Sequence, residues 1–215
     1  MRFIALFITV FILTVIAKGK TDPTALTMGL ASIGKIVGNT IDFPYSPVRL
    51  VVLMLPSHVT LDAIQDVRVA AGLAYIISLI TLVIFVLVVR IGGWPVRNGA
   101  FNVWVNLPLF DPTAGGDVLV RLRRDARFNI AFGFLLPFMI PAVVKATSDL
   151  LDPITLENPQ TLIWTITAWA FLPASMIMRG IAMNRVADLI AAKRRRAYAN
   201  AAAAQNQEQE YQAAY

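Results

Sequence analysis

Two short polar segments hold the residue types that come closest to catalytic or metal-binding chemistry. Ser57 and His58 stand shortly before Asp62, and these are the residue types of a catalytic triad. A nucleophilic serine usually sits in a tight turn flanked by glycines, which is missing here. His58 is the single histidine and there is no cysteine, so a zinc or haem site would need carboxylates or methionines for its other ligands. We expect His58 to lie in an interfacial loop.

The second polar segment surrounds a pair of glycines, Gly115 and Gly116. It lacks the Lys and the Ser/Thr of a phosphate-binding loop. Asp111 and Asp117 could form part of a cation site, but Asp-Pro and Gly-Asp are ordinary turn and helix-cap sequences. We therefore predict no enzyme activity, no cofactor and no metal site; the alternative is a membrane enzyme whose cofactor a partner supplies. The distinctive segment 101–112, FNVWVNLPLFDP, predicts no particular function.

The positions of the ionisable residues do not indicate a transporter. Transporters and pumps need such side chains at membrane depth, and the most apolar segments have none at their centres. Lys145 lies at the end of its segment, where a lysine can extend to the interface; the alternative is a buried functional amine. Lys35 and Arg49 lie outside the segments that we expect to span a membrane.

The composition nevertheless places these residues in a membrane protein. The chain of 215 residues is 57% hydrophobic and 15% charged, whereas a soluble domain has about 25% charged residues. Residues 70–89 carry no charge and would form a helix about 30 Å long, the thickness of the hydrocarbon core. Residues 130–144 and 161–178 are further apolar segments. Residues 3–17 form a shorter one, which we interpret as a retained anchor; the alternative is a cleaved signal peptide.

The sequence therefore predicts an all-α integral membrane protein with about four transmembrane helices, or three if the first segment is cleaved. We divide it into an N-terminal anchor (1–20), an external or interfacial segment with an amphipathic helix (21–69), a membrane domain with a cytoplasmic loop at 93–129 (70–182), and a basic, then Ala/Gln-rich cytoplasmic tail (183–215). Strong helix formers without proline favour a helical tail, although the same composition could be disordered when alone.

Small residues and prolines indicate where helices pack closely. Residues 24–38 have the spacing of an amphipathic helix, which we expect at the interface or packed on the bundle; the alternative is a re-entrant or pore-lining element. Its small residues can accept another helix closely. In the third span, prolines free backbone carbonyls that a neighbouring helix or water must satisfy. The predicted helix-packing residues are Gly29, Ala31, Gly34, Gly38, Gly133, Pro137 and Pro141.

Three local features carry further expectations. Thr60 is expected to cap the helix that contains the central span, and the Gly-rich segment from Gly92 to end it. Residues 48–55 are apolar but too short to cross a membrane, so we expect them to form an apolar loop surface that a partner covers. Trp164 and Trp169 are expected to anchor the outer half of the last span at the interface.

Two basic groups lie beside the last two spans. Asp117 is expected to cap a helix whose apolar stripe, with Leu122 and Ala126, rests on lipid headgroups. The second group follows the last span. The net charge of +6 thus points to anionic lipid rather than nucleic acid. The residues predicted to contact anionic lipid or a partner are Arg121, Arg123, Arg124, Arg127, Lys193, Arg194, Arg195 and Arg196.

The distribution of charge also predicts the orientation. Thirteen of the nineteen Lys and Arg residues fall on one side if the N-terminus, the loop from Arg90 to Asn129 and the segment from Arg179 to the C-terminus share it. The positive-inside rule makes that side cytoplasmic. We therefore expect a multi-pass protein, in a bacterial inner membrane, with its C-terminus in the cytoplasm.

Four incomplete surfaces suggest what such a protein does: the small residues around Gly34, the proline-bearing third span, the apolar segment 48–55 and the tail. Our leading hypothesis is a non-catalytic membrane subunit that scaffolds or assembles a larger complex, such as a secretion or conjugation apparatus, or an accessory subunit of an energy-transducing complex. Its partners would be other membrane subunits or copies of itself, together with anionic lipid, and not nucleic acid or a small-molecule substrate. The alternatives are a small channel or carrier component, and a module that recruits partners through its tail.

Overall fold

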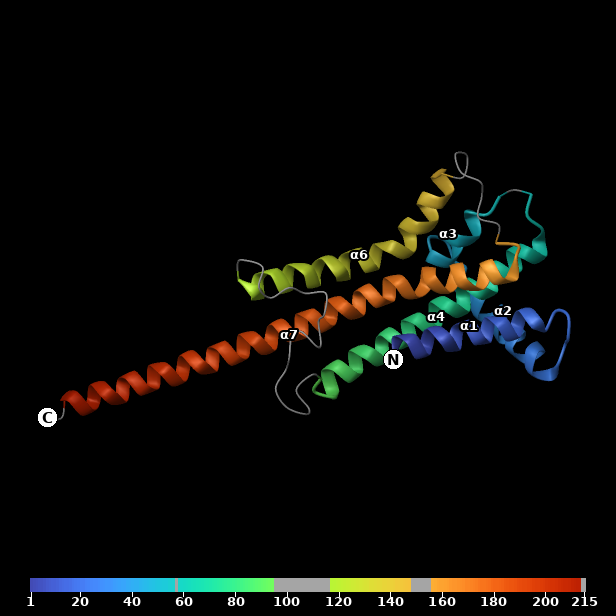
Figure 1. The fold of residues 1–215 in the computed structure, drawn as a ribbon. Helices are drawn as coiled ribbons and strands as arrows, with labels where there is room; N and C mark the ends of the chain where they lie inside the picture. Colours follow the sequence, from blue (N-terminus) through green and yellow to red (C-terminus); the bar gives the residue numbers. More distant parts are fainter. Residues whose placement is uncertain (57, 95–116, 148–155, 214–215) are drawn as a thin grey trace.

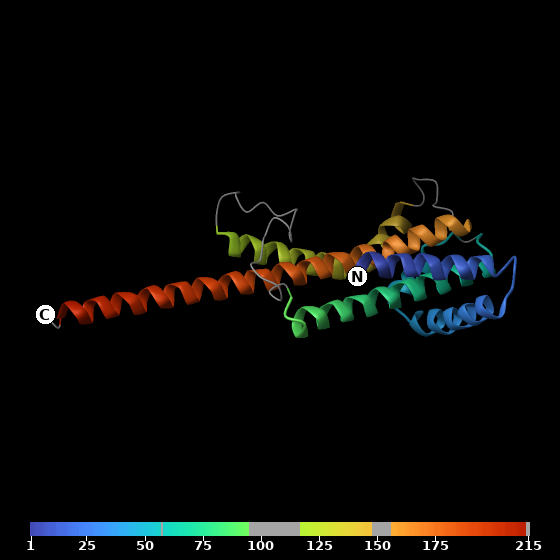
Figure 2. The same cartoon turned by 60° about the horizontal axis from the view of Figure 1, so that its bottom comes forward.

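The computed structural model describes residues 1–56, 58–94, 117–147 and 156–213. In these ranges the regular structure is helical, with α1 (Arg2–Lys18), α2 (Ala25–Ile41), α3 (Pro47–Leu53), α4 (Leu61–Ile91), α6 (Val118–Thr147) and α7 (Pro159–Ala213). The molecule is elongated, and α7 projects past all other helices to the C-terminus in both views (Figures 1 and 2). The distinctive segment 101–112 lies outside the described residues.

Three of these helices, α4, α6 and α7, are long and apolar enough to span a membrane. The predicted first span, α1, has 17 residues and would be about 25 Å long, shorter than the roughly 30 Å of a hydrocarbon core. It packs against α2, α4 and α7. Three candidate spans are thus established, whereas a fourth crossing and an interfacial position of α2 stay predictions.

The helix boundaries follow from local capping. The Thr24 side chain accepts a hydrogen bond from the Thr27 backbone N–H, and a reciprocal bond completes a capping box at the start of α2. Thr60 accepts a hydrogen bond from the Ala63 N–H at 3.2 Å, which confirms its prediction as the cap of α4. Gly92 ends α4, also as predicted.

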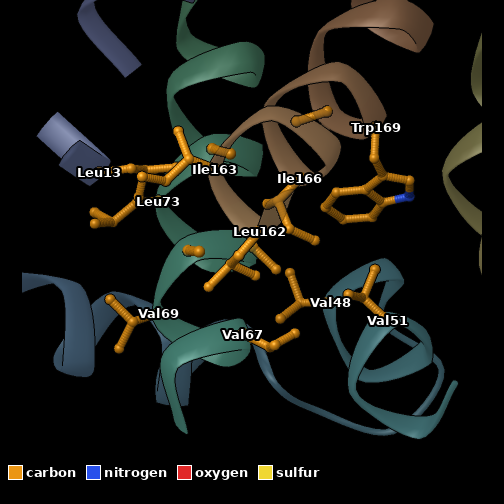
Figure 3. Packing of buried hydrophobic residues seen from close by; sticks show 14 of the residues in the cluster. Leu13, Val48, Val51, Val67, Val69, Leu73, Leu162, Ile163, Ile166 and Trp169 are labelled. Carbon is orange, nitrogen blue, oxygen red and sulfur yellow. The ribbon is translucent and has the colours of Figure 1, made fainter. Parts of the chain in front are cut away.

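The main apolar core joins α1, α3, α4 and α7 (Figure 3). These helices meet at the end of the molecule opposite the C-terminus (Figure 1). Val48 and Val51 of α3 are fully buried in it. The expectation of an apolar loop surface at residues 48–55 was therefore wrong for these two valines, whereas Leu53 is 53% exposed. Ser46 and Pro47 start a short helix there, and this helix turns the two valines onto α4 and α7 (Figure 3).

The basic amphipathic segment and the third span form one continuous helix, α6. Leu122 and Ala126 are buried against Met183 and Val186 of α7. The expectation that this apolar stripe rests on lipid headgroups was wrong, because α7 continues past its apolar segment and offers an apolar face at the same level. We call α6 residues 118–127 and α7 residues 180–192 together the stalk.

The other end of α6 is bent (Figure 1). Pro137 and Pro141 lie inside the helix and both are buried. A proline inside a helix removes a hydrogen bond and its ring pushes against the preceding turn. The bend lies in this proline-bearing part of the helix and turns the last residues of α6 away from the axis of α7.

Candidate functional site

The closest contact between helices is the crossing of α2 and α4. A Cβ atom added at Gly72 would lie 2.6 Å from the Gly38 Cα atom, and one added at Gly38 would lie 2.8 Å from the Arg68 carbonyl oxygen. Both distances are far below the 3.5–4.0 Å of normal carbon contacts. One turn earlier, a Cβ atom at Gly34 would meet the Val69 side chain at 2.7 Å. The crossing thus depends on the absence of side chains on both helices.

The other small residues of α2 lie differently. A Cβ atom at Gly29 would have no atom within 4 Å, so this glycine faces open space. Ala31 is half-buried. The structure therefore brings Gly34 and Gly38 together against α4 and leaves Gly29 outside that contact.

A buried carboxylate stands beside the crossing. Asp42, directly after α2, has only 7% of its side chain exposed. It accepts a hydrogen bond from Arg68 Nε of α4 at 2.7 Å and lies 3.4 Å from Arg49 Nη1 of α3. Arg68 also donates to Gln65 Oε1 at 2.7 Å. Sequence reasoning did not find Asp42, because its partners are distant in sequence and no short motif links them.

The contact between α6 and α7 uses glycines on both helices. A Cβ atom at Gly133 of α6 would lie 2.8 Å from the Pro173 carbonyl oxygen, and one at Gly180 of α7 would lie 2.6 Å from the Ala126 carbonyl oxygen. Gly133 and Ala126 of α6 are as far apart in sequence as Gly180 and Pro173 of α7, so the two contacts fit a pair of antiparallel helices. Gly133 was predicted as a packing residue; Gly180 was missed, because a single glycine forms no recognisable pattern.

The prolines of α6 obtain a partner from α7. Since Pro141 has no N–H, the carbonyl of Pro137 lacks its usual helical donor. The Trp169 indole Nε1–H donates to that carbonyl at 3.2 Å. Trp169 is 5% exposed, whereas Trp164 is 51% exposed. Trp169 is thus a buried contact between helices, which corrects the prediction of an interfacial anchor.

Trp169 also touches the central span. Its ring stacks on Tyr75 of α4, with the ring centroids 5.8 Å apart and the ring planes at 28°. One side chain therefore joins α4, α6 and α7 at the proline bend. We call Tyr75, Pro137, Pro141 and Trp169 the three-helix junction.

On the stalk, ion pairs join α6 and α7. Arg123 Nη2 lies 3.3 Å from Asp188 Oδ1, and Arg194 Nη1 lies 3.0 Å from Asp117 Oδ1. Asp117 also accepts a hydrogen bond from the Leu119 N–H at 3.1 Å, which confirms its prediction as the cap of α6. That bond, together with the Arg194 side chain, holds the pKa of Asp117 below its ordinary value.

The remaining predicted basic residues divide into two sets. Arg124 pairs with the neighbouring Asp125 at 3.7 Å, and Arg127 Nε donates to the Arg123 carbonyl at 3.4 Å; Arg121 lies half-buried on the same helix. Beyond the stalk, three side chains are exposed and have no ion pair within the described part of the chain. These are Lys193, Arg195 and Arg196, which we call the collar.

One small cavity lies between the described helices. A cavity of about 60 Å³ lies between α1, α4 and α7 and is lined by apolar side chains such as Leu13, Ile163 and Val69. Lys20 and Asp66, which pair with each other, stand at it together with Glu157. Among the residues that the structure describes, no three His, Cys, Asp or Glu side chains come together to hold a metal ion.

Comparison with protein-family models, with curated proteins and with solved structures found no match to this chain. The geometry must therefore be interpreted by itself. The glycine crossings, the three-helix junction and the buried Asp42 pairs all fix helices to one another. Along α7, by contrast, residues 193–196 and 198–209 are exposed.

Proposed function

We propose that this chain is a non-catalytic, multi-pass subunit of a bacterial inner-membrane complex, which it helps to hold together. A secretion or conjugation apparatus and an accessory place in an energy-transducing complex both agree with this proposal. The observation that carries it is the free length of α7. Residues 193–213, which we call the arm, continue the helix past the stalk, and Arg194 near their start pairs with Asp117 at the N-terminal end of α6.

Apart from the ion pair of Arg194 with Asp117, the described side chains of the arm form no ion pair or hydrogen bond with another described helix. Residues 193–196 and 198–209 of the arm are exposed. A segment of this length would be a helix of about 32 Å, and most of the stability of helices in proteins comes from packing one face on neighbours. A partner that packs along the arm would supply the missing contacts.

The other surfaces that suggested a partner are covered within the chain. Gly34 and Gly38 contact α4, the prolines of α6 contact α7, and Val48 is buried. The arm is therefore where we place the contact with the complex. For the same reason we prefer this function to a channel: a pathway lined by Gly34 and Gly38 would require α2 and α4 to separate.

Orientation follows from the charges at the ends of the candidate spans. Arg90 of α4, Arg127 of α6 and Arg179 of α7 lie where the apolar segments end on the side of the arm. Under the positive-inside rule we place this side, and with it the arm, in the cytoplasm. α1 contributes Leu13 to the main core, which supports a retained anchor helix.

The test is co-purification from membranes that naturally contain the protein. The full chain, extracted in a mild detergent, should carry partner proteins in constant ratio, and a chain that ends after Ala192 should lose them. The control variant Gly29→Ala changes a residue in open space and should keep them. A full-length chain that purifies without companions, or a truncated chain that keeps all of them, would contradict the proposal.

A further inference from the structure

The collar lies farther along α7 than the end of the apolar segment, at a distance from the expected membrane surface. Gly180 abuts Ala126 and Ile130 of α6, so Arg179 and Arg127 lie at about the same level, where both apolar segments end. Lys193 follows Arg179 by about 21 Å along a straight helix. The Debye length in physiological salt is about 8 Å. Anionic headgroups beside Arg179 are therefore screened from the collar.

The collar surrounds the helix with positive charge. Successive helical residues are about 100° apart, so Lys193, Arg195 and Arg196 point to different sides, and Arg194 between them is directed to Asp117 of α6. Because Arg194 is already paired, we exclude it from the contact surface. The other three side chains are exposed and are available to a partner.

An exposed aromatic residue adjoins the collar. Tyr198 is 74% exposed and stands one turn after Arg194, on the side of α7 that contacts α6 in the stalk. Tyr and Arg are the residue types that contribute most often to the centres of protein interfaces. Tyr198 thus extends the α6-facing side of α7 past the described part of α6.

The charges of the arm also argue against two other binding partners, a second copy of this chain and nucleic acid. Two copies side by side in one membrane would place collar against collar, which is repulsive. Nucleic acid would meet the exposed Glu208 farther along the same helix, and a carboxylate repels phosphates. An acidic protein segment is attracted by the collar and can pack its apolar atoms on Tyr198.

Resting on the proposed function, we propose that the positive charge of the collar attracts an acidic segment of a partner protein, and not lipid. This segment docks on the side of α7 that carries Arg195 and Tyr198, which are about 60° apart around the helix. Charge attraction between the collar and the acidic segment contributes to the affinity, so the affinity falls as the salt concentration rises. Tyr198 contributes apolar contact area, which salt does not screen.

The test uses the full chain in nanodiscs of neutral phosphatidylcholine. The probe is a fluorescent helical peptide of Ala and Glu, with a matched peptide in which Gln replaces every Glu. We expect saturable binding of the Glu peptide only. R195E/R196E should weaken it at least about tenfold, and the matched stalk variant R124E/R127E less than about twofold. Tyr198→Ala should weaken binding at every salt concentration.

Several results would overturn this inference: no binding of the Glu peptide, equal binding of the Gln peptide, or equal losses in the collar and stalk variants.

Because the chain has no cysteine, a spin label at A199C tests the other occupants. We expect it to stay in water in nanodiscs that contain phosphatidylglycerol; burial in lipid, or disulfide-linked dimers of A199C, would refute the acidic partner. If truncation after Ala192 loses the companions while the Glu peptide does not bind, the scaffold function survives and only the chemistry of its partner is wrong.

Discussion

The two halves of α7 form the same helix for different reasons. Between Leu162 and Trp169, apolar side chains are buried against α1, α3 and α4, and this part of the helix is held by its neighbours. From Lys193 onward the side chains are exposed, and the helix depends on Ala, Gln, Glu and Arg, which have high helix propensity. The comparison teaches that continuity of a helix says little about how firmly each part is held.

The packed half also differs in how closely helices approach. At the crossings of α2 with α4 and of α6 with α7, backbone meets backbone through Gly38, Gly72, Gly133 and Gly180. Such contacts tolerate no added atom, whereas the arm touches nothing that would resist one. Four predictions test this contrast, in order of decreasing effect on stability.

The largest effect is expected from Gly72→Ala or Gly38→Ala. The new Cβ atom would meet backbone atoms at 2.6 Å or 2.8 Å, so α2 and α4 must separate, at a cost of about 3 kcal/mol. The measurement is the thermal unfolding midpoint of the purified chain in detergent. Gly29→Ala is the matched control, and by helix propensity it should be neutral or stabilise by up to about 1 kcal/mol. Equal midpoints for all three variants would refute the close crossing.

A smaller loss is expected from Trp169→Phe. The Pro137 carbonyl would lose its donor, and an unsatisfied buried carbonyl costs about 1–3 kcal/mol. Pro141→Ala restores a backbone N–H for that carbonyl, so Trp169→Phe should cost less in the Pro141→Ala background.

A double-mutant cycle measures this coupling through the unfolding midpoints. Trp164→Phe, at an exposed position, is the control and should have little effect. Strictly additive effects of Trp169→Phe and Pro141→Ala would show that the hydrogen bond contributes nothing to the junction.

The third prediction concerns the end of the packed region, where Asp117 pairs with Arg194. Because the fold lowers the pKa of Asp117, its contribution to stability is present above its ordinary pKa of about 3.9 and is lost as the pH falls through the lowered value. Asp117→Asn should therefore lower the unfolding midpoint slightly at pH 7, and the difference from the unaltered chain should shrink as the pH falls below the ordinary pKa of about 3.9. Asp125→Asn, whose partner is the neighbouring Arg124, is the control. A deficit of Asp117→Asn that persists in acid would contradict this assignment.

The smallest effect on stability is expected from Ala202→Pro in the arm. Proline interrupts the helix, so circular dichroism should report a loss of helix. The unfolding midpoint should not move, because the arm has no packing contacts to lose. Ala182→Pro in the stalk should by contrast cost about 3 kcal/mol or more. If Ala202→Pro lowered the midpoint of the isolated chain, the arm would be coupled to the core and the contrast between the halves of α7 would fail.

Features encoded within a few residues could be predicted from the sequence. Thr60 and Asp117 cap their helices as expected, since a cap needs only its own next turn. The need of the proline-bearing span for a neighbouring donor was also predictable. The donor itself, Trp169, was not, because it lies 32 residues away in sequence and its interfacial role was inferred from residue type alone. Asp42 was missed for the same reason, with Arg68 26 residues away.

The unbroken course of α7 has a mechanical consequence. Its 55 residues form a helix about 82 Å long. This helix packs on α6 near Gly180, and its N-terminal part belongs to the core that includes α1, α3 and α4. A sideways force on the C-terminal end of α7 would therefore turn the helix about the stalk, as a lever turns about its fulcrum. The opposing motion reaches Trp169 and, through its hydrogen bond to the Pro137 carbonyl, the proline-bearing bend of α6.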